Sequence, residues 1–413
     1  MTWPVVALGE VAETALGKML DKGRAKGLPH VPYLRNVNVQ WGHIDTDDLA
    51  TMELADEDRE RFAVREGDLL ACEGGEIGRC AIWHGRADYL AFQKALHRIR
   101  PGGALDSRFL RYLLEHHSQT GTLARFATGS TIAHLPQQQL RRVPVPLPPV
   151  HQQRRIVEIL EDHLSRVDAG DLYLDSAGRR LVALRRSTLE EQFGVSGHDV
   201  RLGELVTGIE AGRSFGRSTG PACSDGWGII KVSALTWGEF RPKENKAVPA
   251  EQADPRYEIH EGDLLVSRAN TGEYVGASVL VGPVRGRLLL SDKSLRLNVR
   301  PGVHPDWLWR ALQSPSARGQ MSALATGTKD SMRNISQKSL LQVRLPAHDS
   351  DHQRVAVNQF QAVEDALGRL ALRLAEWHKA AFAMRRAMLA AAFSGRMTDR
   401  HTDREVMEEL DDE

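Results

Sequence analysis

The stretch Pro144-Val-Pro-Leu-Pro-Pro149 and the charged segment 152–193 behind it decide the plan of the chain. Proline fixes φ and removes a backbone N–H, so the strap before Pro149 is predicted to be extended and stiff, while Pro149 is well placed to open a helix. Behind the strap, apolar residues alternate at spacings of three and four, which is the seam of a coiled coil. The stretch therefore predicts one long helix from Gln152 to Phe193, with a seam of Val157, Leu160, Leu164, Val167, Leu174, Leu181 and Leu184.

The same plan returns roughly two hundred residues later. Val343-Arg-Leu-Pro346 precedes a second, more regular seam, and landmark pairs keep their order with an offset of 194 to 200 residues. The second seam consists of Phe360, Val363, Leu367, Leu370, Leu374, Trp377, Ala381, Met384 and Met388. An ordered series of this kind predicts duplicated domains rather than a solenoid of short repeats. The pairs include Leu8-Gly9-Glu10 with Leu202-Gly203-Glu204, Glu66-Gly-Asp-Leu-Leu70 with Glu261-Gly-Asp-Leu-Leu265, Arg100-Pro-Gly102 with Arg300-Pro-Gly302, and Arg185-Arg186 with Arg385-Arg386.

Outside the long helices, apolar residues come in short runs broken by glycine, which predicts short strands and turns. A shorter helix is predicted from Ser107 to His117, behind an Asp106/Ser107 cap. A long helix cannot bury its seam on a small domain alone, so we expect the two long helices to pair antiparallel. The predicted fold is α+β, with two pseudo-symmetric mixed domains at 1–149 and 198–349, long helices at 150–197 and 350–395, and an acidic tail at 396–413.

The approach to the second helix departs from the first. Asp349-Ser-Asp351 stands where the first helix has its proline pair, so this junction is predicted to be less rigid. Asp349 or Ser350 can cap the helix.

Composition limits the classes of partner. Lysine plus arginine and aspartate plus glutamate both number 54, and this zero net charge counts against nucleic acid unless the charge is unevenly placed. It is uneven, because pairs such as Arg141-Arg142 and Arg154-Arg155 contrast with the acidic end at 403–413. Three cysteines cannot make a disulfide framework, and neither a signal peptide nor a membrane-spanning run is visible, so the chain is predicted to be soluble and cytoplasmic.

The chain lacks the usual signatures of catalysis. No G-x-x-x-x-G-K-[ST], H-E-x-x-H or paired C-x-x-C pattern occurs. Cys72, Cys80, His84 and His97 could be imagined as a zinc set, but their spacing is wrong for common sites, and free cysteines are more often small core residues. We therefore expect no catalytic residue, no metal and no cofactor on this chain.

Two groups of residues carry a family likeness. One group is Ala127-Thr-Gly-Ser-Thr-Ile-Ala-His-Leu-Pro136 with the strap and His151-Gln-Gln-Arg-Arg-Ile-Val-Glu-Ile-Leu160, and the other comprises segments 66–79 and 92–101. Together they resemble specificity subunits of type I restriction-modification enzymes. The resemblance implies two target-recognition domains that each read one half of a bipartite, asymmetric double-stranded DNA site. It also implies two methyltransferase subunits docked on the helices and restriction subunits joining them, with S-adenosylmethionine, ATP and Mg²⁺ on those partners.

Polar and basic residues that differ between the two halves are the candidates for DNA contacts. Arginine suits guanine and asparagine suits adenine at base edges, while lysine suits phosphate. The alternative interpretation of each candidate, without a role in DNA binding, is a hydrated turn or a solvated surface charge. The candidates are Arg35, Asn36, Arg79, Lys94, Ser130, Thr131 and His134 in the first half, and Lys231, Arg268, Asn270, Lys293, Thr328, Lys329 and Arg333 in the second, with Lys94 paired to Lys293 and His134 to Arg333.

Two other functions compete with sequence-specific DNA binding. A free-standing restriction and methylation enzyme is disfavoured by the missing cofactor motifs, and methylation by the purified chain alone would revive it. A coiled-coil adaptor that binds only proteins would be favoured by a lack of DNA affinity.

Overall fold

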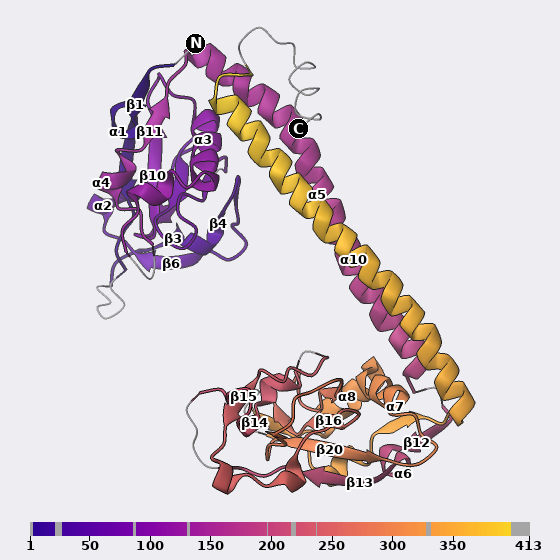
Figure 1. Cartoon of the computed structure of the whole chain (residues 1–413). Helices are drawn as coiled ribbons and strands as arrows, with labels where there is room; N and C mark the ends of the chain where they lie inside the picture. The colour runs from indigo at the N-terminus through magenta and orange to yellow at the C-terminus, as the bar shows by residue number, and fades with distance from the viewer. Residues whose placement is uncertain are drawn as a thin grey trace. The chain divides into compact units, whose positions relative to one another are not determined.

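The computed structural model describes residues 3–20, 27–85, 88–129, 133–195, 197–215, 220–236, 238–327 and 332–397. The chain divides into two compact units. Unit 1 comprises residues 1–174 and 376–413, and unit 2 comprises residues 175–375. Each unit contains one mixed domain and half of each long helix, α5 (Val150–Phe193) and α10 (Ser350–Phe393) (Figure 1).

The domain of unit 1 is built on a four-stranded antiparallel sheet of order β2-β10-β7-β8. A three-stranded sheet, β6-β3-β9, and the pairs β1-β11 and β4-β5 complete it. Its elements are β1 (Val5–Ala7), α1 (Leu8–Val11), β2 (Ala12–Leu16), β3 (His30–Leu34), β4 (Val39–Gln40), β5 (His43–Ile44), β6 (Ala50–Glu53), α2 (Asp56–Phe62), β7 (Leu69–Cys72), β8 (Cys80–Ile82), β9 (Ala91–Phe92), β10 (Leu96–Pro101), α3 (Ser107–Gln119), α4 (Gln137–Leu140) and β11 (Pro144–Pro146), with 3-10 turns at Asn36–Asn38 and Leu123–Phe126.

The domain of unit 2 repeats this plan. Its four-stranded sheet has the order β13-β20-β16-β18, and β15-β14-β19, β12-β22 and β17-β21 accompany it. Its elements are β12 (Asp199–Arg201), α6 (Leu202–Leu205), β13 (Val206–Ala211), β14 (Gly228–Ile230), β15 (Asn245–Ala247), β16 (Leu264–Ser267), β17 (Ala269–Asn270), β18 (Ser278–Leu280), β19 (Leu288–Leu289), β20 (Ser294–Val299), α7 (Pro305–Gln313), α8 (Pro315–Leu324), β21 (Arg333–Asn334), α9 (Gln337–Leu340) and β22 (Arg344–Pro346), with 3-10 turns at Val232–Ala234, Ala250–Gln252 and Pro255–Tyr257.

Equivalent backbone details show that the duplication is structural. The strap is extended in both units, since β11 pairs with β1 and β22 pairs with β12. Gly67 and Gly262 have positive φ in the turn before the strands β7 and β16, as the repeated Glu-Gly-Asp motif predicts. Gly17 and Gly212 directly follow β2 and β13, and each lies so close to another backbone that an added Cβ would be 2.2 Å from a carbonyl oxygen.

Each long helix has a buried glutamine in its first turn. Gln153 accepts the N–H of Asp106 at 2.8 Å, and Gln353 accepts the N–H of His304 at 2.9 Å. The amide nitrogen of each glutamine donates to a carbonyl just before its own helix at 2.8 Å. Asp349 caps α10 as expected, accepting the N–H three residues on at 2.9 Å. The second approach therefore lacks the proline pair but has the same glutamine contacts as the first.

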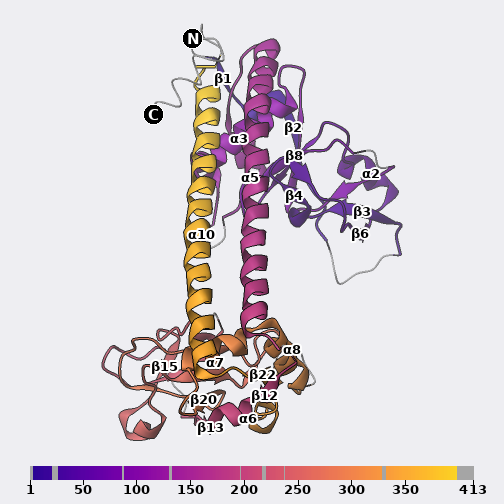
Figure 2. The same ribbon diagram turned by 90° about the vertical axis from the view of Figure 1, so that its right-hand side faces the viewer.

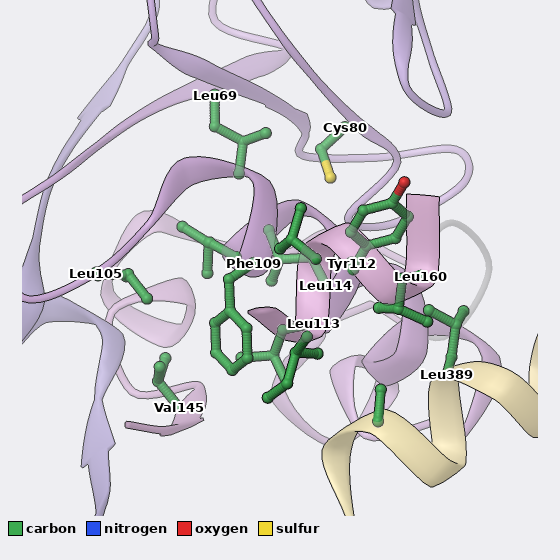
Figure 3. Close-up of a cluster of buried hydrophobic side chains, with 14 of the residues drawn as sticks. Leu69, Cys80, Leu105, Phe109, Tyr112, Leu113, Leu114, Val145, Leu160 and Leu389 are labelled. Atoms are coloured by element: carbon green, nitrogen blue, oxygen red, sulfur yellow. The ribbon is translucent and has the colours of Figure 1, made fainter. Parts of the chain in front are cut away.

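The core of unit 1 joins its domain to both long helices. Phe109, Leu113 and Leu114 of α3 share one buried cluster with Leu160 of α5 and Leu389 of α10 (Figure 3). The predicted Asp106 cap of α3 is confirmed, since its carboxylate accepts the N–H groups of residues 108 and 109. Burial of about 25 cal/mol per Å² of apolar surface is the main force holding such a cluster together.

The helices pair antiparallel in each unit, as predicted, and the two views agree on this (Figure 1 and Figure 2). In unit 1, Asp168 contacts Arg385 and Asp171 lies 3.5 Å from His378, so residue numbers rise along α5 as they fall along α10. In unit 2, Arg185 bonds Glu364 at 2.7 Å, and Phe193 packs edge-on against Phe360 with ring centroids 5.4 Å apart. The predicted α+β fold with two paired long helices is confirmed.

An ion-pair network ties the helix pair to the domain of unit 1. Glu115 of α3, whose side chain is 4% exposed, accepts two hydrogen bonds from the guanidinium of Arg385 on α10. Arg385 also bonds Asp168 of α5 at 2.6 Å, and Arg111 lies 3.5 Å from Glu115.

Unit 2 uses a different network at the corresponding place. Arg310 of α7 bonds Glu364 of α10 at 2.5 Å, and Arg185 of α5 bonds the same carboxylate. Together the two guanidinium groups lower the pKa of Glu364 although burial opposes this. Each domain is therefore matched to its own half of the helix pair.

Several residues of the predicted seam stay exposed. Leu184, Leu370, Trp377 and Met384 have between 38% and 57% of their surface accessible, although the 3-4 spacing placed them between the helices.

Within the described part of the chain, no helix has the length and apolar character needed to cross a bilayer. Residues 398–413 of the predicted acidic tail lie outside the described residues.

Unit 1 is expected to lose stability in mild acid because it contains two buried histidines and one half-buried histidine. Burial lowers the pKa of His97, His116 and His117, that of His116 to about 4 from 6.5. The unfolded chain then binds protons that the folded unit does not, so this stability is complete above pH 6.5 and declines as the pH falls towards 4. Thermal unfolding of unit 1 between pH 7 and 5 should show a falling Tm, with a shallower slope in His116→Gln. The exposed His43→Gln should leave the slope unchanged, and equal slopes in all three proteins would contradict the prediction.

Candidate nucleic-acid interface

One edge of the four-stranded sheet gathers candidate residues of unit 1. The loop 73–79 joins β7 to β8 there, and two backbone hydrogen bonds tie other segments to Glu73. Its N–H donates to the carbonyl of Ala95 at 3.0 Å, and its carbonyl accepts the N–H of Leu135 at 2.7 Å. The segments 35–38, 73–79, 93–95 and 133–135 are termed the site edge of unit 1. The strand ends at this edge are Leu16 of β2, Cys72 of β7, Cys80 of β8 and Leu96 of β10.

Three of the candidates converge on the loop 73–79. The side-chain amide of Asn36 donates to the carbonyl of Gly74 at 3.0 Å, and the guanidinium of Arg79 donates to the amide oxygen of Asn36 at 2.9 Å. Gly74 also forms a backbone bridge with His134, whose ring lies so close that an added Cβ would be 2.9 Å from Nδ1. Asn36 and Arg79 therefore use their polar atoms to hold the loop, while His134 is exposed beside it.

The remaining described candidates of unit 1 differ in whether their polar atoms already have a partner within the chain. Arg35 bonds the carboxylate and the backbone carbonyl of Asp48, both at 2.7 Å, so its charge is already compensated. Lys94 is exposed in the turn before β10. His97, buried behind it, donates from Nε2 to the carbonyl of Leu135 at 2.7 Å, and its lowered pKa keeps the ring neutral for this contact.

The site edge of unit 2 is built in the same way from segments 231–236, 268–274, 291–293 and 332–335. The N–H of Arg268 donates to the carbonyl of Lys293 at 2.8 Å, and the carbonyl of Arg268 accepts the N–H of Ile335 at 3.0 Å. Asn270 pairs with Arg333 across β17 and β21. The structure thus brings Arg268, Asn270, Lys293 and Arg333 together.

The candidates of unit 2 also differ in whether their side chains already have a partner within the chain. The guanidinium of Arg333 donates to the carbonyl of Ala325 at 2.7 Å, and Lys231 lies 3.5 Å from the carboxylate of Glu244. Hydrogen bonding from Ser233 and the charge of Lys231 lower the pKa of Glu244. Arg268 and Lys293, by contrast, are exposed.

The hydrogen bonds correct two predicted pairings between the halves. Ala95 and Lys293 accept equivalent bonds, so Lys293 does not correspond to Lys94. His134 and Asn334 form equivalent bridges with Thr128 and Thr326, so His134 does not correspond to Arg333. Both pairings are wrong by one residue, because the offset between the halves changes across loops of unequal length.

Sequence reasoning missed three residues at these edges. Glu73 occupies the place in unit 1 that Arg268 occupies in unit 2, as the two pairs of backbone bonds show. Lys18 and Arg213 follow the close-packed Gly17 and Gly212 at the ends of β2 and β13, next to the edges. A glycine followed by a basic residue, repeated at an offset of 195, was the available signal.

Four candidates, Ser130, Thr131, Thr328 and Lys329, lie outside the described residues. Among the residues that the structure describes, no group of three or more His, Cys, Asp and Glu side chains could hold a metal. Cys72 and Cys80 are fully buried in the core, and burial raises the pKa of both thiols, which therefore stay protonated and act as small core residues.

A second feature of unit 1 is a groove of about 550 Å³ between α5 and α10. Its apolar lining includes Tyr173, Trp377 and Met384, which are 78%, 57% and 38% exposed. Exposed aromatic and methionine side chains gathered in one groove are typical of a protein-binding surface.

Comparison with known proteins agrees with the geometry of the two domains. Residues 1–169 match the family model described as type I restriction modification DNA specificity domain. The chain is 34% identical over 149 residues to the EcoEI type I restriction enzyme specificity subunit of Escherichia coli, an alignment covering 34% of this chain but only 24% of that protein. It is 23% identical over 343 residues to the EcoKI specificity subunit of E. coli K12, covering 77% of this chain and 73% of that protein.

A solved structure extends the likeness in fold to nearly the whole chain. A chain from a study of complex assembly and conformational transition of the type I R-M system superposes with a TM-score of 0.71 at 20% sequence identity, covering 95% of this chain and 97% of that one. The family model and the curated relatives agree with the resemblance seen in the sequence: residues 1–169 match the type I restriction modification DNA specificity domain, and the chain is similar to type I specificity subunits along most of its length.

Proposed function

We propose that the chain is a non-catalytic specificity subunit that reads a bipartite, asymmetric sequence in double-stranded DNA, one half-site per domain, in the cytoplasm. The observation that carries the proposal is the pair of site edges. Equivalent backbone bonds support Glu73 in one domain and Arg268 in the other, so one scaffold presents different chemistry to two ligands. Phosphate contacts from exposed cations such as Lys94 and Lys293 would fix the position of each domain, and other side chains would read base edges.

The partners are proposed from the same family. Two methyltransferase subunits would dock on the long helices and restriction subunits would join them, bringing S-adenosylmethionine, ATP and Mg²⁺ with them. The apolar groove of unit 1 supports such docking, because its exposed aromatic side chains resemble the buried centre of an interface.

Replacing Trp377 with alanine is expected to weaken binding of the cognate methyltransferase subunit by about 30-fold, which corresponds to the roughly 2 kcal/mol of an aromatic hot spot. Calorimetric titration of the two purified proteins would measure the change. Leu172→Ala is the matched control, because Leu172 lies on α5 next to Tyr173 and is 70% exposed but is not part of the groove. Equal affinities for the two variants would remove the groove from the docking surface.

The function is tested by mapping methylated bases in DNA from cells that express the cognate methyltransferase subunit with or without this chain. One bipartite motif that disappears without the chain is the expected result. Methylation that is absent, or unchanged when the chain is deleted, would contradict the proposal and favour a coiled-coil adaptor that uses the groove to bind proteins only.

A further inference from the structure

We propose that Glu73 and Arg268 read bases from one equivalent position of the two domains, Glu73 taking a cytosine in one half-site and Arg268 a guanine in the other. The inference rests on the function proposed above and assigns a ligand to each residue.

The two residues share one backbone position. Each directly follows the central strand that ends at its site edge, β7 or β16. Each N–H donates to the turn before the next strand of the sheet, at Ala95 or Lys293, and each carbonyl accepts from the segment at Leu135 or Ile335. Because the backbone is held on both sides, the side chain leaves the edge from a fixed point in each domain.

Four other charged candidates at the site edges already have partners within the described residues, whereas Glu73 and Arg268 have none there. Arg35 and Lys231, which lie at another equivalent position, face the carboxylates of Asp48 and Glu244. Arg79 and Arg333 donate to loop carbonyls or amides. Among the described residues, none forms a hydrogen bond or an ion pair with the carboxylate of Glu73 or the guanidinium of Arg268. Arg268 is exposed and Glu73 is partly exposed, so the polar atoms of both side chains can take a ligand.

The chemistry of the pair indicates bases rather than phosphates. A carboxylate repels phosphate, so Glu73 at a DNA surface has a use only where a base offers a donor, and the N4 amino group of cytosine is the donor that Glu and Asp accept from. The fork of an arginine fits the O6 and N7 acceptors of guanine. The carboxylate of Glu73 and the guanidinium of Arg268 would therefore select different bases in the two half-sites, although the backbone that carries them is the same in both domains.

The experiment is a map of methylated bases in cells that contain the cognate methyltransferase subunit and one of four variants. Glutamine prefers adenine, so Glu73→Gln should change one position of one half-site from cytosine to adenine, by about 10-fold or more in preference. Arg268→Gln should change one position of the other half-site from guanine to adenine. Glu66→Gln, in the turn before β7, and Arg201→Gln, at the end of β12 before α6, should keep the original motif.

The outcomes separate this inference from the function on which it rests. A wild-type chain that gives no bipartite motif overturns both. If the wild type gives a bipartite motif and neither Glu73→Gln nor Arg268→Gln changes its bases, only the base assignment is overturned. This holds whether methylation stays strong or weakens uniformly, as it would on loss of a phosphate contact. Should Arg268→Gln abolish methylation, Arg268→Lys decides the matter: a lysine still suits guanine, so the original motif must return.

Discussion

Replacing Glu115 with alanine is expected to lower the free energy of unfolding of unit 1 by about 3–5 kcal/mol, because it removes one partner of a buried ion pair and leaves the charge of the other poorly compensated. The Glu115 side chain is 4% exposed and Arg385 is 15% exposed. Arg385 would keep only Asp168, whose own side chain is 58% exposed, and Arg111 would lose its carboxylate as well. The loss should detach the end of α10 from α3 before it affects the sheet.

Hydrogen exchange of unit 1 peptides during denaturant titration would measure this effect. Glu161→Ala is the matched control: Glu161 also pairs with an arginine, Arg108 at 3.0 Å, but both side chains are about 40% exposed, so the pair should be worth no more than about 1 kcal/mol. An equally small loss for Glu115→Ala would show that the buried network does not hold the helix to the domain.

Phe360→Ala is expected to destabilise unit 2 by about 3–5 kcal/mol, as large-to-small changes of buried aromatic residues do. Phe360 is fully buried, its ring packs edge-on against Phe193, and the guanidinium of Arg310 lies 5.0 Å from its centroid. Alanine would leave a cavity under the Arg310–Glu364 pair and remove the cation–π contact, so both the packing and the ion pair should weaken.

The comparison for Phe360 is Phe382→Ala on the same helix, where the ring is 57% exposed. Denaturation followed by hydrogen exchange should show a large loss confined to unit 2 for Phe360→Ala and almost none for Phe382→Ala. A loss in unit 1 instead, or equal losses for the two variants, would show that the Phe360 ring does not anchor α10 in the core of unit 2.

Repeats and periodicity were enough to predict the fold because they act through local rules. The paired Glu-Gly-Asp turns, the proline strap and the 3-4 seams each have a structural meaning that needs no distant contact. The seam rule failed at Trp377 and Met384, since the pattern does not tell whether a second helix covers a given apolar position or leaves it open in a groove.

The site was harder to predict because a charged side chain is free to bind DNA only where no other residue of the chain already pairs with it. Arg35 and Arg268 look alike in the sequence, but Asp48, thirteen residues from Arg35, compensates only the first. Glu73 was missed as a candidate because an acidic residue is unexpected at a DNA surface, although the offset of 195 residues at the repeated Glu-Gly-Asp-Leu-Leu motif already pairs it with Arg268, as the backbone bonds confirm. Unequal loops likewise hid the one-residue error at Lys94, since counting along the chain cannot detect where an insertion falls.

The make-up of unit 1 has a consequence for how the chain matures during its synthesis. Unit 2 is continuous, so all of its residues have been made once Ala375 is added, whereas unit 1 needs Met388, Leu389 and Ala392 from α10 to fill a core begun with Leu8. Chains usually fold from the N-terminus as they leave the ribosome. In this chain the order is reversed, because the core of the domain translated first stays incomplete until α10, the last helix of the described chain, has emerged. A truncated product would carry a finished unit 2 and an unfinished unit 1.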